Sequence, residues 1–475
     1  MTERPETERH GPEQYDGRLV AAVRAGDADA VRALLEAGAD PDTTDTDGLP
    51  VLCTAVAAFA HEVAEVLVQG GADPDRELPD GTTPLLRAVE GGSPAVVGAI
   101  RGDVALRLSQ VQRERLLAAA RRWYRTGAEA ELRRRTGEQG PARTVSVPEE
   151  EFRVEEVTLG GRTVRAGHGA VLTTLEWAFG MPAPVEELMG RAARVADADH
   201  VDWSASCWNL AGRLSAETWL QVVAFHRHPS PVHRAFVADF LRFGALLHGM
   251  YSQHPRWYER ERCRVLAAWA EEETDGAVLA AVLDAVSFDD IPESHALGLL
   301  HAGHPDPRVR RMVPRLFDEP LTGGAAAAVR ALAGDPVPEV RAAAAEALGS
   351  GEALTDEDRG LVTALLRDPD LQVRDAASYA VARGRDRSPA VTEALFALLD
   401  ADEQQVRLNC AYGLALRDDP RTPEAYGRVG PLGPEYEDDF RSDGLWRWRM
   451  RNEDGRRSRQ PSGGSGGQPS GGSAG

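Results

Sequence analysis

The sequence predicts an all-α protein organised as an α-solenoid, and two sets of internal repeats support this fold class. Near the N-terminus two motifs each occur twice, 33 residues apart: D-G-x-x-x-L at 47–52 and 80–85, and G-A-D-P-D at 38–42 and 71–75. In the C-terminal half, a seven-residue motif ending in Val-Arg recurs every 31 to 33 residues, at 304–310, 335–341, 368–374 and, more weakly, 401–407. Fixed periods of this length are typical of helical pairs that stack on one another. Such stacks mostly present surface to a partner, so we expect a binding protein.

The charge balance indicates which partners the surface can attract. The chain has 475 residues and a net charge of −21, and all 54 of its basic residues are arginine. This acidity repels nucleic acid and anionic membranes, so we expect another protein as the partner and no nucleic acid; the oligomeric state stays open. The richness in Ala, Gly, Arg, Pro and Val is typical of a GC-rich bacterial gene, which explains the arginines better than selection for bidentate recognition.

The cysteines and the hydropathy indicate the compartment. Cys53, Cys207, Cys263 and Cys410 are far apart and form no CxxC pair, so no zinc site is expected and reduced thiols are the default. The first 17 residues are polar, and no run approaches 18 apolar residues. We therefore expect a cytoplasmic protein with no signal peptide and no membrane span.

Residues 17–104 carry the first repeat. Apolar residues at three- and four-residue spacing give each short helix one buried stripe. Gly38 and Gly71 come directly after helix ends, where glycine readily adopts a left-handed cap, and Thr83-Pro84 provides a helix start. The segment resembles the ankyrin repeats, whose unit reads D-G-x-T-P-L-h-x-A and then G-A-D-P-N. Residues 80–88 match this unit closely, whereas the copy at 47–55 departs from the T-P pair.

The first array is short, because its third unit lacks a G-A-D-P loop after it. At least about three units are normally needed for stability, so we expect the array to dock on the helices C-terminal to it. An Arg-rich amphipathic helix at 109–135 is expected to cap it. Residues 145–165 then alternate apolar and polar side chains around Gly160-Gly161, which predicts a small β-hairpin. The run Glu149-Glu150-Glu151 is either a solvated linker or an acidic patch.

The second repeat has a form that suits a turn between two helices. Asp can accept from free amides at a helix start, Pro needs no amide donor there, and Val begins a buried stripe that runs from Val340 to Leu348. The segment resembles HEAT-like repeats, specifically the short type found in phycobilisome lyases. That resemblance implies that Asp and Arg tie successive repeats together, and it assigns this role to Asp335, Asp368, Arg310, Arg341, Arg374 and Arg407. Further copies are expected at 228–234 and, degenerate, near 274–279.

These signals divide the chain into six segments. They are a disordered leader at 1–16, ankyrin repeats with a capping helix at 17–140, a linker with the hairpin at 141–166, a divergent HEAT-like region at 167–300, HEAT-like repeats at 301–420, and an extended Arg/Trp segment with a disordered Gly/Ser tail at 421–475.

Catalytic motifs are absent from the sequence: it contains no P-loop, GxGxxG, GxSxG or HExxH. Its histidines gather at His226, His228, His233, His248 and His254, with His301 and His304 further on. Helix geometry sends residues two apart to different sides, so turn or surface roles are favoured over metal binding. We expect no catalytic residue, no metal and no cofactor.

Residues 200–209 bring a histidine, an acid, hydroxyls, a thiol and two tryptophans into one segment. Core packing of Trp203 and Cys207 explains it best, with a ligand groove or a Cys–His pair as alternatives. The segment 445–459 interleaves arginine with tryptophan. We expect it to dock on the acidic solenoid or on a partner protein, rather than on nucleic acid or lipid.

The sequence therefore favours a non-enzymatic scaffold that binds protein through a preformed, concave surface. On the ankyrin side, contacts are expected at turn tips and inner helices: Thr43, Thr44, Asp45, Arg76 and Glu77. On the HEAT-like side they are expected on the second helix of each pair: Asp375, Ser378, Arg383, Asn409 and Tyr412. The alternative is a HEAT-like lyase, isomerase or accessory protein that binds a small apolar ligand between the tryptophans near 203–219. A HEAT-like DNA glycosylase is disfavoured by the charge.

Overall fold

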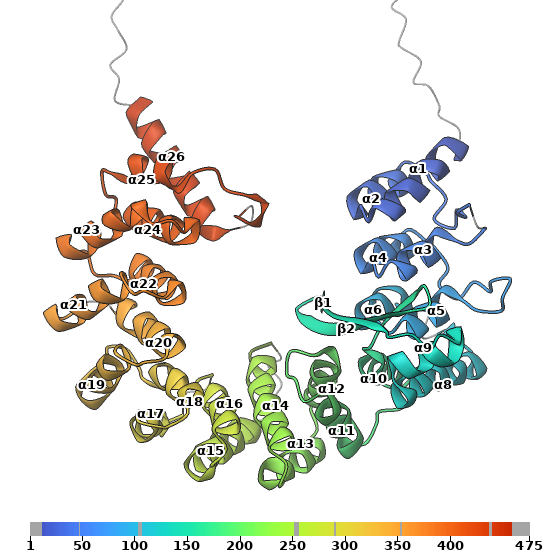
Figure 1. Ribbon diagram of the computed structural model, residues 1–475, viewed down its shortest axis with the longest axis horizontal. Helices are drawn as coiled ribbons and strands as arrows, with labels where there is room; N and C mark the ends of the chain where they lie inside the picture. The colour runs from blue at the N-terminus through green and yellow to red at the C-terminus, as the bar shows by residue number, and fades with distance from the viewer. Residues whose placement is uncertain are drawn as a thin grey trace, which may run out of the picture. The chain divides into compact units, whose positions relative to one another are not determined.

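Helical pairs occupy most of the chain, as the repeats predict (Figure 1). The computed structural model describes residues 12–46, 48–102, 107–250, 256–288, 291–351, 354–436 and 439–457. Its contacts divide the chain into two units, Met1–Arg260 and Glu261–Gly475. The division between the units lies within the segment 167–300 that the sequence analysis assigns to the divergent HEAT-like region.

The first unit begins with three ankyrin-type pairs. They are α1 (Pro12–Ala25) with α2 (Ala28–Glu36), α3 (Val51–Ala57) with α4 (His61–Gln69), and α5 (Pro84–Gly91) with α6 (Pro94–Arg101). α1 starts before the expected boundary at 17, and residues 1–11 lie outside the described part of the chain. Thr83 caps α5 by accepting from the Leu86 amide, and Gly38 and Gly71 adopt φ values of 98° and 106°. The local start and stop signals are thus confirmed.

The short array is completed by three helices C-terminal to it. They are α8 (Gln110–Thr126), α9 (Ala128–Thr136) and α10 (His168–Ala178). Leu116 of α8 and Leu172 of α10 belong to the same apolar core as the ankyrin helices, from Leu19 onward. The predicted docking is confirmed. The single capping helix expected at 109–135 is instead two helices that meet at Gly127: α8 packs on the ankyrin core, whereas α9 packs with Trp123 against the strands that follow. Because of this shared core, α10 belongs to the same compact unit as the ankyrin helices.

A small antiparallel sheet comes after α9. Its strands are β1 (Arg143–Glu149), β2 (Phe152–Leu159) and β3 (Arg162–Arg165), in the order β1-β2-β3. The expected Gly160-Gly161 turn joins β2 to β3, and a second turn pairs Glu149 with Phe152. The segment 141–166 is therefore a three-stranded sheet, because the Glu-rich run is a tight turn in which Glu150 adopts a φ of 54°.

The remaining helices of this unit complete its second half. They are α11 (Val185–Val195), α12 (Val201–Gly212), α13 (Ala216–Val223), the 3-10 turn η1 (Ala224–Arg227) and α14 (Pro231–Met250). α14 starts at the expected repeat copy 228–234, where Arg234 donates to the His228 carbonyl at 2.9 Å. α15 (Arg256–Glu272) crosses the division between the units.

The second unit consists of two layers of helices (Figure 1). One layer holds α17 (Ser294–His301), α19 (Gly323–Leu332), α21 (Asp356–Leu365), α23 (Pro389–Ala397) and η3 (Leu398–Asp400). The other holds α16 (Gly276–Val286), α18 (Pro307–Met312), η2 (Val313–Leu316), α20 (Pro338–Gly349), α22 (Leu371–Arg383) and α24 (Gln404–Leu416). The repeated Val-Arg motif stands at the start of α18, α20, α22 and α24, so these are the second helices of their pairs.

Arginine–carboxylate pairs join successive repeats, as the resemblance implied. Arg310 contacts Asp335 at 2.7 and 3.0 Å, and Arg341 contacts Asp368 at 2.8 Å through both nitrogens. Hydrogen bonding from Arg341 holds the pKa of the Asp368 carboxyl below its ordinary value. One further pair joins Arg374 to Glu403 of the weaker copy.

Arg407 has no acidic partner among the described residues. Like the other motif arginines it donates to a carbonyl of its own loop, that of Ala401. In place of a carboxylate it also reaches the Val429 carbonyl of the next helix at 3.4 Å, because the regular array ends there.

The C-terminal segment is helical, where an extended chain was expected. It comprises α25 (Thr422–Val429), η4 (Pro434–Tyr436) and α26 (Phe440–Arg457). Leu445 and Trp448 of α26 are buried in the same core as the repeats, which gives the segment a reason to fold as a helix. The last two residues of the Arg/Trp segment and the Gly/Ser tail, together 458–475, lie outside the described residues.

Candidate functional site

The ankyrin residues predicted for partner contact lie at the turn tips, but they do not all face outward. The Thr43 carbonyl accepts from the Val51 amide at 2.9 Å, and the Asp45 carboxylate accepts from the Leu49 amide at 3.0 Å. Thr43 and Asp45 are half-buried and shape the turn, whereas Thr44, Arg76 and Glu77 are exposed. The turn tips therefore offer a small polar surface built on a rigid loop.

Three of the residues predicted on the HEAT-like side form one network beneath the surface. Asn409 donates to the Asp375 carboxylate at 2.9 Å and to the Ser378 hydroxyl at 2.9 Å. Ser378 and Asn409 are fully buried, and burial raises the pKa of the Asp375 carboxyl. These residues tie α22 to α24 and are not part of an open surface, which corrects the expectation for Ser378 and Asn409.

Helix α26 covers the face on which these residues were expected to bind a partner. Arg441 donates to the Asn409 side-chain oxygen at 2.5 Å, and Phe440 packs edge-on against Tyr412 at 5.7 Å. Gly444 lies so close to Tyr412 that a Cβ there would approach the ring to 2.4 Å. The expectation that the Arg/Trp segment 445–459 docks on the solenoid is confirmed at Leu445 and Trp448, which are buried in the core of the repeats. Tyr412 is consequently occupied, whereas Arg383 stays exposed and donates to the Tyr379 hydroxyl at 2.7 Å.

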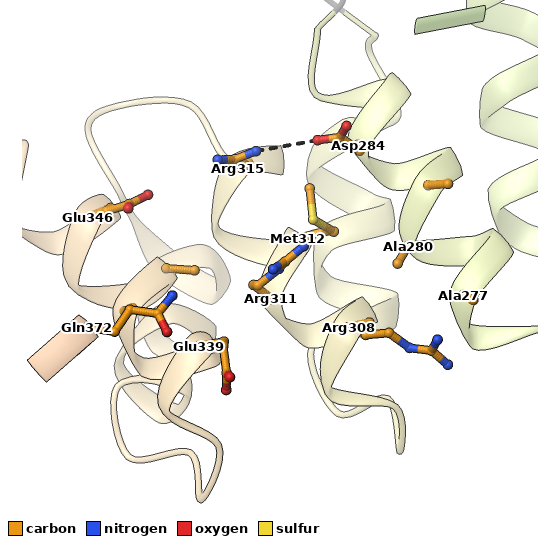
Figure 2. A pocket seen from close by; sticks show the side chains of 13 residues that line it. Ala277, Ala280, Asp284, Arg308, Arg311, Met312, Arg315, Glu339, Glu346 and Gln372 are labelled. Atoms are coloured by element: carbon orange, nitrogen blue, oxygen red, sulfur yellow. Dashed lines mark hydrogen bonds and ion pairs between the residues drawn. The ribbon is translucent and has the colours of Figure 1, made fainter. Parts of the chain in front are cut away.

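The layer formed by the second helix of each pair has an open surface nearer the start of the second unit, on α16, α18 and α20. A groove of about 470 Å³ lies there between α16, α18, α20 and the first turn of α22 (Figure 2). Its lining includes five alanines and one methionine, at Ala277, Ala280, Ala281, Ala342, Ala343 and Met312. We call this the alanine groove. Small side chains on adjacent helices leave room for another chain to approach their backbones closely.

Charged side chains stand around the alanine groove (Figure 2). Arg308 is paired with Asp306 at 2.6 Å, and Arg315 with Asp284 at 3.4 Å. The structure gives Arg311, Glu339 and Glu346 no ion-pair partner among the residues it describes, and all three are exposed. Within that part of the chain, the groove thus presents a free cation on α18 opposite two free anions on α20.

The contact residues expected on the second-helix face lie on α22 and α24, whereas the alanine groove lies on α16, α18 and α20 of the same layer. The signal was available in part: Glu339, Ala342, Ala343 and Glu346 are spaced at i, i+3, i+4 and i+7, so they share one face of α20. Nothing in the sequence showed that α26 covers α22 and α24 while α16 to α20 stay open.

His228 and His304 act in turns, whereas His301 is buried at the end of α17. His228 accepts from the Ser230 amide at 3.1 Å, His304 accepts from the Asp306 amide at 3.1 Å, and His301 contacts the Ala270 carbonyl at 2.9 Å. The His248 side chain and residue His254 lie outside the described part. Within that part, no group of three or more His, Cys, Asp or Glu side chains is placed to hold a metal ion.

Residues 200–209 form the N-cap and most of helix α12, and most of them are buried. His200 caps α12 by accepting from the Asp202 amide, and Trp203 donates to Asp239 at 2.8 Å. Cys207 is fully buried, and burial raises the pKa of its thiol well above the ordinary value, which is the reverse of what a nucleophile needs. Trp208 differs from these residues, because 41% of its surface is exposed.

The comparisons with known proteins agree with the two repeat types. A family model described as "Ankyrin repeats (3 copies)" matches residues 19–103, and a "HEAT repeat" model matches residues 327–350. These matches do not support the finer likeness to the phycobilisome-lyase-like type. No curated protein matches the chain.

One solved structure, an X-ray structure of the Escherichia coli protein YibA, is 15% identical with a TM-score of 0.41. The match covers 56% of this chain and 93% of that one. A likeness this distant assigns neither fold nor function. Within the part of the chain that the structure describes, we find no helix with both the length and the apolar character needed to cross a membrane.

Proposed function

We propose that this protein is a non-enzymatic scaffold that binds a segment of another protein in the alanine groove. The observation that carries the proposal is the set of charges without partners among the described residues, Arg311 against Glu339 and Glu346, around a floor of alanines. Exposed charges without partners cost nothing in the free protein and gain partners on binding. Repeat surfaces of both matched types generally serve as protein-interaction modules, which supports the same interpretation.

The groove favours a partner segment of mixed charge. A carboxylate on the segment would pair with Arg311, and flanking basic side chains would pair with Glu339 and Glu346. Exposed ion pairs contribute only about 0–1 kcal/mol each, so they select the partner and its orientation. Affinity would come from apolar side chains that cover the alanines and Met312.

A cytosolic setting is part of the proposal. All four cysteines are free, and Cys53, Cys207 and Cys410 are buried, which suits a reducing compartment. A small apolar ligand in place of a protein would need an apolar groove, and the charges of the alanine groove offer that alternative no support.

The test is capture by the full-length chain from a lysate of the source cell, followed by mass spectrometry. Arg311→Glu should lose the retained protein, because the substitution places a third anion beside Glu339 and Glu346. The matched control is Arg367→Glu, which makes the same charge change at an exposed position in the turn after α21. Equal retention by both variants would contradict the proposed surface.

A further inference from the structure

A second groove lies in the first unit, away from the turn tips. It has a volume of about 470 Å³ and is lined by α4, α6, the β1–β2 turn, α10 and α12. An adjoining hollow of about 530 Å³ lies between α2 and α4, and both include Glu65 in their lining. We call the two together the acidic groove. It runs along the second helix of each ankyrin pair, that is α2, α4 and α6, and extends from Asp27 to Trp208.

The turn that walls this groove is rigidly built. Glu149 is buried and accepts from the Ala95 amide at 3.0 Å and from the Ser93 hydroxyl, and it pairs with Arg165. This anchors the β1–β2 turn to the start of α6. Glu150, the next residue, is exposed at the groove. The Glu149-Glu150-Glu151 run is therefore neither a linker nor a uniform patch: one glutamate holds the wall and the next is displayed on it.

The charge of the groove is one-sided. The arginine in its lining, Arg32, is already paired with Asp29 at 2.6 Å. Glu62, Glu65 and Glu150 are exposed and have no cationic partner among the described residues. Several uncompensated carboxylates on one concave surface attract a cationic ligand and raise its local concentration.

The far end of the groove is aromatic and fixed. Trp208 packs edge-on against Phe243 at 4.8 Å, which sets its orientation while leaving it partly exposed. Beside it the lining is small: Gly98, Ala99 and Ala205. An exposed indole next to a shallow floor can accept either an aliphatic side chain or the flat face of a guanidinium.

We propose that the acidic groove binds an extended, arginine- or lysine-rich segment of a partner protein. Basic side chains face Glu62, Glu65 and Glu150, and a basic or aliphatic side chain packs on Trp208. The charge complementarity and the aromatic end select this occupant over an acidic or uncharged peptide. This site shares no lining residue with the alanine groove, so an experiment can contradict one of the two proposals without contradicting the other.

The test uses the full-length protein and a short fluorescein-labelled peptide that alternates arginine and leucine, with binding followed by fluorescence anisotropy. Glu65→Lys combined with Glu150→Lys should weaken binding about tenfold or more, since it replaces two attractions with two repulsions. Both side chains are exposed, so the variant should fold, which a melting curve verifies.

The controls separate a site from the general acidity of the chain. Glu36→Lys changes the charge of an exposed residue at the opposite end of α2 and should leave affinity unchanged. Arg311→Glu in the alanine groove should also leave it unchanged. Equal weakening by Glu36→Lys would overturn the proposal, as would unchanged binding by the double variant.

A second measurement places the peptide directly. A photo-crosslinking version of the same peptide should label residues 94–99 and 201–208, which line the groove. Labelling concentrated elsewhere would overturn the proposal even if the affinities had agreed with it. Concentration-dependent dimerisation that the double variant abolishes would likewise replace a partner protein with a second copy of this chain.

Discussion

The two repeat arrays have nearly the same period but hold their neighbours together differently. In the ankyrin part, the polar link between the two loops is exposed and weak: the Asp73 amide donates to Asp42 at 3.2 Å, and Arg76 approaches the same carboxylate only to 4.0 Å. In the second unit, a partly buried arginine spans each of the regular interfaces with paired bonds, as Arg341 does to Asp368. The ankyrin array therefore depends on its apolar stack and on the cap at its end, whereas the HEAT-like array also depends on polar pairs between repeats.

The largest expected effect comes from opening a cavity between the capping helix α8 and the sheet. Trp123 of α8 is buried, stacks on His168 at 4.8 Å and lies under Arg135 at 4.6 Å. Trp123→Ala should destabilise the first unit by about 3–5 kcal/mol, because a large side chain leaves a cavity between the cap and the sheet. Denaturant unfolding monitored by hydrogen exchange should show the loss in residues 12–250, with the second unit unchanged. Loss in both units together would mean that they unfold as one.

An internal cavity in the second array should have a comparable effect on that unit. Leu348 of α20 is buried against the neighbouring repeats. Leu348→Ala should cost about 2–5 kcal/mol. Leu371→Ala is the matched control, since 48% of Leu371 is exposed, and it should shift the melting temperature little. An unchanged melting curve for Leu348→Ala would show that α20 does not pack against its neighbours.

Acid should weaken the first unit through His168. Burial lowers the pKa of His168 from 6.5 to about 4, so the unfolded chain takes up its proton more readily between these values. Stability therefore falls as the pH drops from 6.5 to 4, by on the order of 3 kcal/mol for this group.

Burial raises the pKa of Asp202 to about 6, and this group therefore gains stability for the folded state as the pH falls. Because the two effects oppose each other, the contribution of His168 has to be isolated with a variant. His168→Gln keeps a donor for the Glu90 carbonyl and does not titrate. Urea unfolding at pH 7 and pH 4.5 should show a smaller difference for the variant than for the parent chain. Identical differences would exclude His168 as the source.

Removing the Arg341–Asp368 ion pair between repeats should have a smaller effect on the free energy of unfolding, and this effect distinguishes the two arrays. Arg341→Ala removes the bonds to Asp368 and to the Asp335 carbonyl and should cost about 1.5–3 kcal/mol. Arg76→Ala, its counterpart in the ankyrin part, should change stability by no more than about 0.5 kcal/mol. Urea unfolding of the two variants gives both values, and similar losses for both would remove the contrast between the arrays.

The Arg341–Asp368 pair should also make the stability of the second unit depend on pH in the acid range. The Asp368 pKa is below its ordinary value of 3.8 in the folded state, so this stabilisation is present above that pH and is lost as the pH falls further. Arg341→Ala should abolish that part of the acid loss. The Arg341–Asp368 pair thus responds at a lower pH than His168 does.

Features that depend on short stretches of chain could be predicted from the sequence. The caps at Thr83 and Gly38, the turn at Gly160 and the pairs from Arg310 and Arg341 arise from residue types at fixed offsets. The periods then fix which helices stack, because each unit can bury its apolar face only against its neighbour. The burial of Ser378 and Asn409 could not be predicted, since both carry the same surface-type pattern as exposed polar residues.

The sequence by itself determined the two repeat types, their order, the second-helix position of the Val-Arg motif and the acidic character of the surface. Only the tertiary structure decided that α26 covers α22 and α24, that α10 joins the core of the ankyrin part, and that Glu149 is buried while Glu150 is displayed. The physical reason is range. Caps and repeats are set by residues a few positions apart, whereas which surface stays open depends on segments far apart in the chain that compete to bury the same apolar faces.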